Sequence, residues 1–451
     1  MKLSFKMLLS VAAAGLISAS AAYAGPIDIL SAYKMARESD PSYASAKAGR
    51  VAGSEKEIQG RALFLPSVAL SASVTQNRLD TSYINTPNGF SLQGGVKSYD
   101  SEAIGVSVVQ PIYRAQNSAT ASQLTTASEL SAVSLKAAEQ DLILRVAQAY
   151  FDILLAEDSI KFINGYKHAI AEQLAQAKRS FEVGVTTITD THEALARSDL
   201  AAAQEIAALN DLDVKKDSLR KIIGIVPESV SPLAENAALG REDILGEEKW
   251  METAAKESPF VKSQQLALSA AQDEAKKAQA GHYPTLDGVA SYGYSRASDS
   301  SLGAGNATTA GIIGAQLAIP IYQGGSVSSK EREAAALEMK ARSDLEAAVR
   351  QARSQATSAF VGVKNGLAQA GAMRQAVASS QKALESTRKG FEVGVRTGVD
   401  VLNAQQQLYA AQRDHAQALY NYILSFLRLK AAVGTLDDKD AEWVNTLLAR
   451  P

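Results

Sequence analysis

The prolines of this chain are spaced so unevenly that they limit the folds open to it. None of the 11 lies in residues 112–226 or 321–450, and both stretches are rich in Ala, Leu, Gln, Glu, Lys and Arg. Proline interrupts helices and these residue types favour them. We therefore predict two long helical segments. A chain of 451 residues would otherwise suggest three compact domains of about 150 residues each.

The composition excludes several classes of function. The chain has no cysteine, so it holds no disulfide, Cys-ligated metal, thiol nucleophile or lipid on an N-terminal cysteine. Its formal net charge of −2 gives no bulk electrostatic reason to bind nucleic acid. The four histidines are scattered, and no Gly-rich phosphate-binding loop is present. We expect no enzyme, no catalytic residue, no metal and no cofactor.

Residues 1–24 have the pattern of an export signal. A basic start precedes an apolar run at 7–17, and Ala22-Tyr23-Ala24 forms a small-x-small cleavage site. The run is too short to cross a bilayer as a helix. We expect a Sec-exported protein of the bacterial envelope or exterior, without a lipid anchor.

The chain reads as an internal duplication. Phe181-Glu182-Val183-Gly184-Val185 recurs unchanged as Phe391-Glu392-Val393-Gly394-Val395, and the same offset maps Gly224 onto Gly434. Five such markers keep one order, which chance similarity of Ala-rich helices does not explain. The expected organisation is a signal peptide at 1–24, a first repeat at 25–224, a linker at 225–250, a second repeat at 251–434 and a C-terminal tail at 435–451.

Each repeat contains two segments in which oily residues alternate with small or polar ones, as in strands. The second segment places Ile104 and Val106 on the oily face, and we assign Glu102 to the polar face. The expected strands lie near 67–75, 102–108, 286–295 and 312–319.

Strands of about 9–10 residues are long enough to cross a bilayer when tilted. Four strands cannot close a barrel, and lipid does not tolerate open strand edges. We therefore expect several chains to share one membrane barrel. The alternative is a soluble four-stranded sheet that packs one face on helices.

The predicted helices differ in length in a regular way. A helix over 115–180 would be roughly 99 Å long, whereas the return helix over 189–223 would be about half as long. The short helix at 41–64 is close to the missing length, so we expect one long helix beside two shorter ones. Alanine-rich faces suit a ring of helices, although alanine also simply favours helices.

Several motifs, in this order within a duplication, resemble the TolC family of outer-membrane exit ducts. They are Pro320-Ile321-Tyr322-Gln323-Gly324-Gly325 at a strand-to-helix junction and Gly394-Val395-Arg396-Thr397-Gly398-Val399-Asp400-Val401-Leu402-Asn403 at a turn. The opening Asp28-Ile29-Leu30-Ser31-Ala32-Tyr33, followed by Asp40-Pro41, is similar to the branch used in type I protein secretion. The resemblance covers nearly the whole chain after the export signal.

The resemblance implies a mainly α fold with a membrane β-barrel. A homotrimer would build a 12-stranded barrel on a long α-helical barrel, with an equatorial belt from 225–250 and the tail after Gly434. The barrel would lie in the lipid of the outer membrane and the helices in the periplasm. A periplasmic adaptor and an inner-membrane pump, ABC-type or proton-driven, would open this passive duct at its helix tips.

The tips carry a local signal of their own. Thr187-x-x-Asp190 and Thr397-x-x-Asp400 match the capping box at the start of a helix. The resemblance adds that these tips form the closed entrance and that Asp400 belongs to a carboxylate ring at the pore constriction. Such a ring favours cations.

Further tip residues take roles from the resemblance. Arg396 would reach toward Thr189 and Asp190 of a neighbouring hairpin. Asn403 occupies a second ring position where the best-known members carry a carboxylate, and Phe391 replaces a tyrosine that would donate to Asp190. We expect an entrance held closed more by Arg396 than by Phe391 and only moderately cation-selective. The tip turns themselves contain Phe181, Gly184, Phe391 and Gly394.

Two rival interpretations remain. A periplasm-spanning structural coiled-coil protein without a pore would carry a sustained heptad and would need no lipid-facing alternation. An exported enzyme on a helical scaffold would need an acid–base or metal cluster, which the sequence lacks.

Overall fold

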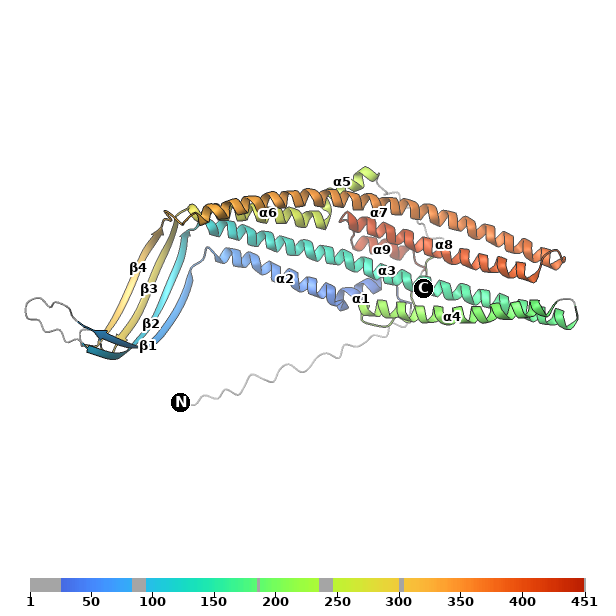
Figure 1. Cartoon of the computed structure of the whole chain (residues 1–451), viewed down its shortest axis with the longest axis horizontal. Helices are drawn as coiled ribbons and strands as arrows, with labels where there is room; N and C mark the ends of the chain where they lie inside the picture. Colours follow the sequence, from blue (N-terminus) through green and yellow to red (C-terminus); the bar gives the residue numbers. More distant parts are fainter. Residues whose placement is uncertain (1–25, 83–94, 185–186, 235–245, 300–303, 450–451) are drawn as a thin grey trace, which may run out of the picture.

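The computed structural model describes residues 26–82, 95–184, 187–234, 246–299 and 304–449. The molecule is elongated, with a four-stranded sheet at one end and the tips of two helical hairpins at the other (Figure 1). The expected signal peptide lies outside the described residues.

The same order of elements occurs twice, as the duplication predicts. The first copy contains α1 (Ile29–Ser39), α2 (Pro41–Ala62), β1 (Ser67–Thr81), β2 (Gly95–Tyr113), α3 (Ala115–Glu182) and α4 (Ile188–Ile223). The second contains α5 (Glu247–Glu257), α6 (Pro259–Gln279), a 3₁₀ turn η1 (Ala280–His282), β3 (Thr285–Ala297), β4 (Asn306–Ala318), α7 (Ser326–Glu392) and α8 (Gly398–Ala432), before α9 (Asp438–Thr446). Pro41 and Pro259 each occupy the first turn of a helix, where proline costs no hydrogen bond.

Two very long helices set the length of the molecule. α3 has 68 residues and α7 has 67, which gives each roughly 100 Å. In Figure 1, α2 and α4 follow one another along α3, and α6 and α8 follow one another along α7. This is the expected arrangement of one long helix beside two shorter ones. None of the described helices combines the length and apolarity needed to cross a membrane.

Small residues let neighbouring helices approach closely. A Cβ atom added at Gly53 of α2 would lie 2.1 Å from Oγ of Ser131 on α3. That hydroxyl is held in place, because it donates to the carbonyl of Ser128 at 2.6 Å and accepts from Nη1 of Arg50 at 3.0 Å. Here the small residue is required by packing between helices, beyond its effect on helix propensity.

The four strands form one antiparallel sheet in the order β1-β2-β3-β4. The central β2–β3 pairing joins the two repeats, for example through Val106 opposite Tyr292. β1 and β4 each have one neighbour within the chain, so both carry a free edge. The strands have 15, 19, 13 and 13 residues, longer than the 9–10 expected. The predicted strands were too short because alternating hydrophobicity reveals only the apolar part of each strand and not the polar residues that continue it.

The register also corrects the position of Glu102. It lies opposite Val74 of β1 and Arg296 of β3. Side chains two residues apart on a strand point to the same side, and so do residues directly opposite in an antiparallel pair. Glu102 therefore shares the face of Ile104 and Val74, and its assignment to the polar face was wrong. On that face, the apolar band ends where Glu102 and Arg296 meet as neighbours of opposite charge.

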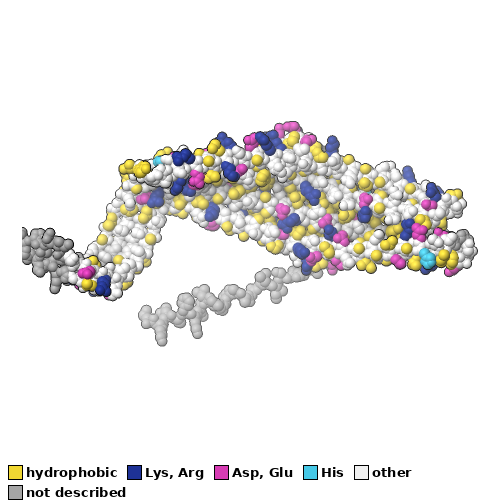
Figure 2. Space-filling model, in the orientation of Figure 1, with side chains coloured by type: hydrophobic (Ala, Val, Ile, Leu, Met, Phe, Trp, Pro, Cys, Tyr) yellow, Lys and Arg dark blue, Asp and Glu magenta, His cyan; other side chains and the backbone are white. Residues whose placement is uncertain are grey.

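No described helix covers either face of the sheet. The apolar side chains are strongly exposed, with Leu70 at 71%, Val74 at 78% and Ile313 at 89%. In Figure 2 most of the sheet is yellow and white, and its charged side chains gather toward its ends. The alternative of a soluble sheet packed on helices was therefore wrong. The apolar face matches a lipid-facing surface.

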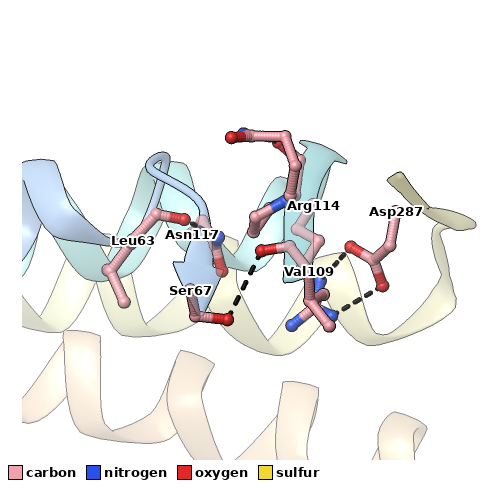
Figure 3. Close-up of polar contacts among 8 residues, drawn as sticks. Leu63, Ser67, Val109, Arg114, Asn117 and Asp287 are labelled. Atoms are coloured by element: carbon pink, nitrogen blue, oxygen red, sulfur yellow. Dashed lines mark hydrogen bonds and ion pairs between the residues drawn. The ribbon is translucent and has the colours of Figure 1, made fainter. Parts of the chain in front are cut away.

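A polar joint connects the sheet to the helices (Figure 3). Nε and Nη2 of Arg114, which precedes α3, bind the two carboxylate oxygens of Asp287 on β3 at 2.8 and 2.6 Å. Asn117 of α3 donates to the carbonyl of Leu63 after α2 at 2.6 Å. The start of α3 is thus tied both to the sheet and to the end of α2.

The main core lies around the waist of the molecule. It contains the fully buried Tyr150 from the middle of α3 and Tyr422 from the C-terminal third of α8. The hydroxyl of Tyr150 donates to the carbonyls of Ile27 and Ser231 at 3.1 and 2.8 Å.

Segments distant in sequence meet at this waist. Single β-bridges join Ile27 to Val230 and Leu233 to Leu448. The expected linker at 225–250 falls partly outside the described residues, and its end at 250 lies within α5. Helix α5 therefore belongs with the second repeat from Glu247 onward.

Candidate functional site at the helix tips

The two hairpin tips lie together at the end of the molecule opposite the sheet (Figure 1). Each turn contains a glycine in the left-handed region, Gly184 with φ 76° and Gly394 with φ 75°. Residues with a Cβ rarely adopt this conformation, which is why glycine ends both α3 and α7. Val183 and Val393, just before these glycines, are each 73% exposed. The repeated turn therefore presents two matching apolar tips.

Both return helices begin with the expected capping box. The backbone N–H of Thr187 donates to Oδ2 of Asp190 at 3.1 Å, and that of Thr397 donates to Oδ2 of Asp400 at 2.9 Å. The Thr397 backbone and hydroxyl, with a smaller contribution from Arg396, lower the pKa of Asp400. Asp400 is therefore ionised at neutral pH, and it combines a capping role with a fixed negative charge at the tip.

Residues of the two hairpins line a common groove of about 790 Å³. Of the expected site residues, Asp190, Phe391, Gly394 and Arg396 line this groove, whereas Thr189, Phe181, Gly184, Asp400 and Asn403 are not among its lining residues. Gln405 of α8 also lines it, is 3% exposed, and has a side-chain oxygen without a hydrogen-bond partner.

Arg396 forms no hydrogen bond or ion pair through its side chain with Thr189 or Asp190 among the described residues of this single chain. Its backbone N–H donates to the carbonyl of Gly390 at 3.1 Å and closes the turn. Since the resemblance assigns its contact to a neighbouring hairpin, that role stays a prediction.

Phe391 acts as an apolar contact between α7 and α8. It packs on a small cluster that contains Leu384, Val401 and Leu408. Its ring has no hydroxyl, so it cannot donate to Asp190. What it contributes to the tip is hydrophobic packing.

The structure adds a residue that sequence reasoning missed. Nη1 of Arg197 on α4 donates to Oδ1 of Asn403 at 2.9 Å, and Nη2 lies 3.1 Å from Oε1 of Glu193. The i,i+4 spacing of Glu193 and Arg197 was visible in the sequence. Its link to Asn403, 206 residues away, was not.

The described residues contain no group of three or more His, Cys, Asp or Glu side chains suited to hold a metal. The tips instead combine charge, caps and apolar contacts in a narrow region. Such an arrangement can hold two hairpins together or let them part, and it can select ions by charge.

Comparisons with known proteins agree with this architecture. The family model described as "Outer membrane efflux protein" matches residues 32–225 and 250–435. The chain is 32% identical over 415 residues to the outer membrane protein TolC of Vibrio cholerae, covering 92% of each chain. It is 30% identical over 421 residues to the alkaline protease secretion protein AprF of Pseudomonas aeruginosa, covering 93% of this chain and 86% of that protein.

Solved structures show the same fold at lower identity. The outer-membrane channel OprN superposes with a TM-score of 0.75 at 16% identity, covering 90% of each chain. The outer membrane protein VceC of Vibrio cholerae gives a TM-score of 0.72 at 18% identity, covering 90% of this chain and 96% of that one.

Proposed function

Because the chain belongs to the family of outer membrane efflux proteins, we propose that it is a passive exit channel of the outer membrane that serves a tripartite efflux or type I secretion system. One observation carries this function. A sheet with an exposed apolar face and two free edges stands at one end of helices roughly 100 Å long. A structural coiled-coil protein would have no use for such a sheet.

The active form is proposed to be a homotrimer. Four strands per chain cannot close a barrel, and edges at β1 and β4 cannot remain open in lipid. Three copies of the sheet supply twelve strands if β1 of one chain pairs with β4 of the next. The α-helices of the three chains would then surround a continuous duct below the membrane.

The energy for transport is proposed to come from an inner-membrane pump, ABC-type or proton-driven, joined through a periplasmic adaptor. The sequence has no Gly-rich phosphate-binding loop with which to use ATP itself. Similarity to AprF and to the proteases secretion protein PrtF of Dickeya chrysanthemi, at 28% identity over 442 residues, supports a place in type I secretion.

The helix tips are proposed to be the entrance of the duct. Asp400 would contribute one carboxylate per chain to a ring that favours cations. Arg396, without a side-chain bond to Thr189 or Asp190 of its own chain, would bind these residues on the neighbouring chain. Phe391 and the neutral Asn403 add no charge, so the expected cation preference is moderate.

Planar-bilayer recording of the purified protein tests the function. We expect discrete, moderately cation-selective channels of low conductance in the closed state. A protein that inserts into the bilayer as an intact oligomer and never conducts would contradict the proposed function.

A further inference from the structure

The hairpins of the tip region are joined by a specific polar contact. Arg197 lies on the return helix of the first hairpin and Asn403 on the return helix of the second. Their bond, from Nη1 to Oδ1 at 2.9 Å, is the only side-chain hydrogen bond or ion pair between α4 and α8 among the described residues. Elsewhere α4 packs mainly on α3, and α8 on α3 and α7.

Both terminal nitrogens of the Arg197 guanidinium are held by a partner. While Nη1 binds Asn403, Nη2 binds Glu193 on the preceding turn of α4 at 3.1 Å. The Arg197 side chain is only 20% exposed, against 41% for Glu193. A planar fork held by a carboxylate on its own helix loses little further freedom when it binds a second acceptor.

Asn403 is suited to this partner because it is neutral. Its amide oxygen accepts a bond from a charged donor, which is stronger than a bond between neutral groups. Glu193 already balances the charge of Arg197, so the acceptor does not need to be a carboxylate. The amide at the expected second ring position is thereby explained by its contact on α4.

We propose that Arg197 is a positioning residue that holds the second hairpin against the first through Asn403 and so keeps the entrance closed. This inference rests on the proposed function, because it assumes that the hairpins part when the duct opens. Parting α4 from α8 breaks the Arg197–Asn403 bond in each chain. A partly exposed bond of this kind shifts such an equilibrium by about three- to tenfold per chain.

Three substitutions distinguish a contact that holds the two hairpins together from a residue that only lines the ring at the pore constriction. Arg197→Gln shortens the donor, and Asn403→Leu removes the acceptor while keeping the number and branching of the side-chain heavy atoms. Asn403→Asp keeps the acceptor and adds charge toward Arg197. The matched control is Arg342→Gln, because among the described residues the Arg342 side chain binds Glu338 alone, one turn away on its own helix α7.

Single-channel recording of these variants gives the first readout. We expect Arg197→Gln and Asn403→Leu to raise the open probability severalfold, with the double variant no higher than the larger single effect. Asn403→Asp should stay at or below the wild-type open probability, and Arg342→Gln should match wild type. If Arg197→Gln and Asn403→Leu leave the open probability unchanged while Asn403→Asp raises conductance and cation selectivity, Asn403 acts only as a ring residue and the inference is overturned.

Cross-linking gives a readout independent of conduction. The chain has no native cysteine, so the double variant Arg197→Cys, Asn403→Cys carries the only two thiols. We expect a short bis-maleimide to join them within one chain and to suppress opening. If the wild-type protein conducts but the double-cysteine variant forms no cross-link within one chain, or opens as before once cross-linked, the inference alone is contradicted. Wild-type protein that never conducts would contradict the proposed function and this inference together.

Discussion

The ion pair between Asp40 and Arg145 offers the sharpest test of how the waist is held together. Asp40 precedes α2, and its side chain is 4% exposed. It accepts the backbone N–H of Tyr43 at 2.7 Å and two bonds from Arg145 of α3, at 2.8 and 3.1 Å. Arg145, 32% exposed, also binds Asp141 at 2.6 Å. One carboxylate thus caps α2 and joins it to α3.

The variant Arg145→Leu leaves the buried carboxylate with only the helix N-terminus as a partner. Removing one member of a buried pair typically costs 3–5 kcal/mol, of which the helix N-terminus recovers a part. We therefore expect a loss of about 2–4 kcal/mol in the free energy of unfolding. Asp40→Asn should cost only about 1 kcal/mol, since asparagine caps helices as well as aspartate and Arg145 keeps Asp141.

The double variant decides whether this reasoning holds. With no charge left to bury, Arg145→Leu combined with Asp40→Asn should be more stable than Arg145→Leu alone by about 1 kcal/mol or more. Urea unfolding of the detergent-solubilised protein, followed by circular dichroism, gives the three values. A double variant whose loss equals the sum of the single losses would refute the coupling.

The same pair predicts a dependence on pH. Bonds from Arg145, and secondarily from the backbone of Tyr43, lower the pKa of Asp40 in the folded protein. A lowered pKa contributes stability above the unfolded value of about 3.9, and this contribution is lost as pH falls through the folded value. Acid unfolding of Asp40→Asn should lack this component below about pH 4. An unchanged acid profile in that variant would contradict the assignment.

Three further changes test other parts of the molecule. Gly53→Ala should lower the free energy of unfolding by about 1–3 kcal/mol because the added Cβ has no room. Gly49→Ala, which meets nothing within 4 Å, should raise it by about 0.5–1 kcal/mol. Equal effects of the two variants in denaturant unfolding would contradict the packing of α2 on α3. Arg114→Leu should destabilise the protein by about 1–2 kcal/mol because it leaves Asp287 unpaired. Arg114→Asp combined with Asp287→Arg should recover part of the lost stability, measured as the temperature at which the oligomer dissociates. No recovery in the swapped variant would contradict the role of this ion pair in joining the sheet to α3. Asp400→Asn keeps an oxygen for the helix cap but loses the negative charge. Reversal potentials should therefore show weaker cation selectivity, while the oligomer stays intact. Unchanged selectivity would contradict the placement of Asp400 in the carboxylate ring.

Local signals in the sequence were sufficient for most of the helices. Pro41 and Pro259 start α2 and α6, and the proline-free stretches became α3 and α7 with their return helices. Proline, glycine and capping residues act within a few residues of where they stand, so their consequences can be read directly. The capping boxes at Asp190 and Asp400 belong to this class and were confirmed.

Features that depend on distant residues escaped prediction. The face of Glu102 is a different kind of miss, because the two-residue period of a strand already places it with Ile104, and its register against Val74 and Arg296 agrees. The bond of Arg197 to Asn403 requires two hairpins to be brought together by packing at the waist. Likewise, the polar ends of β1 and β2 carry no apolar alternation, so strand pairing is the only sign that they are strands.

We propose that three chains share one membrane barrel, and the number of chains per complex tests this most directly. Native mass spectrometry of the protein extracted from outer membranes should give a complex of three chains that survives in detergent and dissociates on heating. A water-soluble monomer after export, or a stable complex with any other number of chains, would contradict the account.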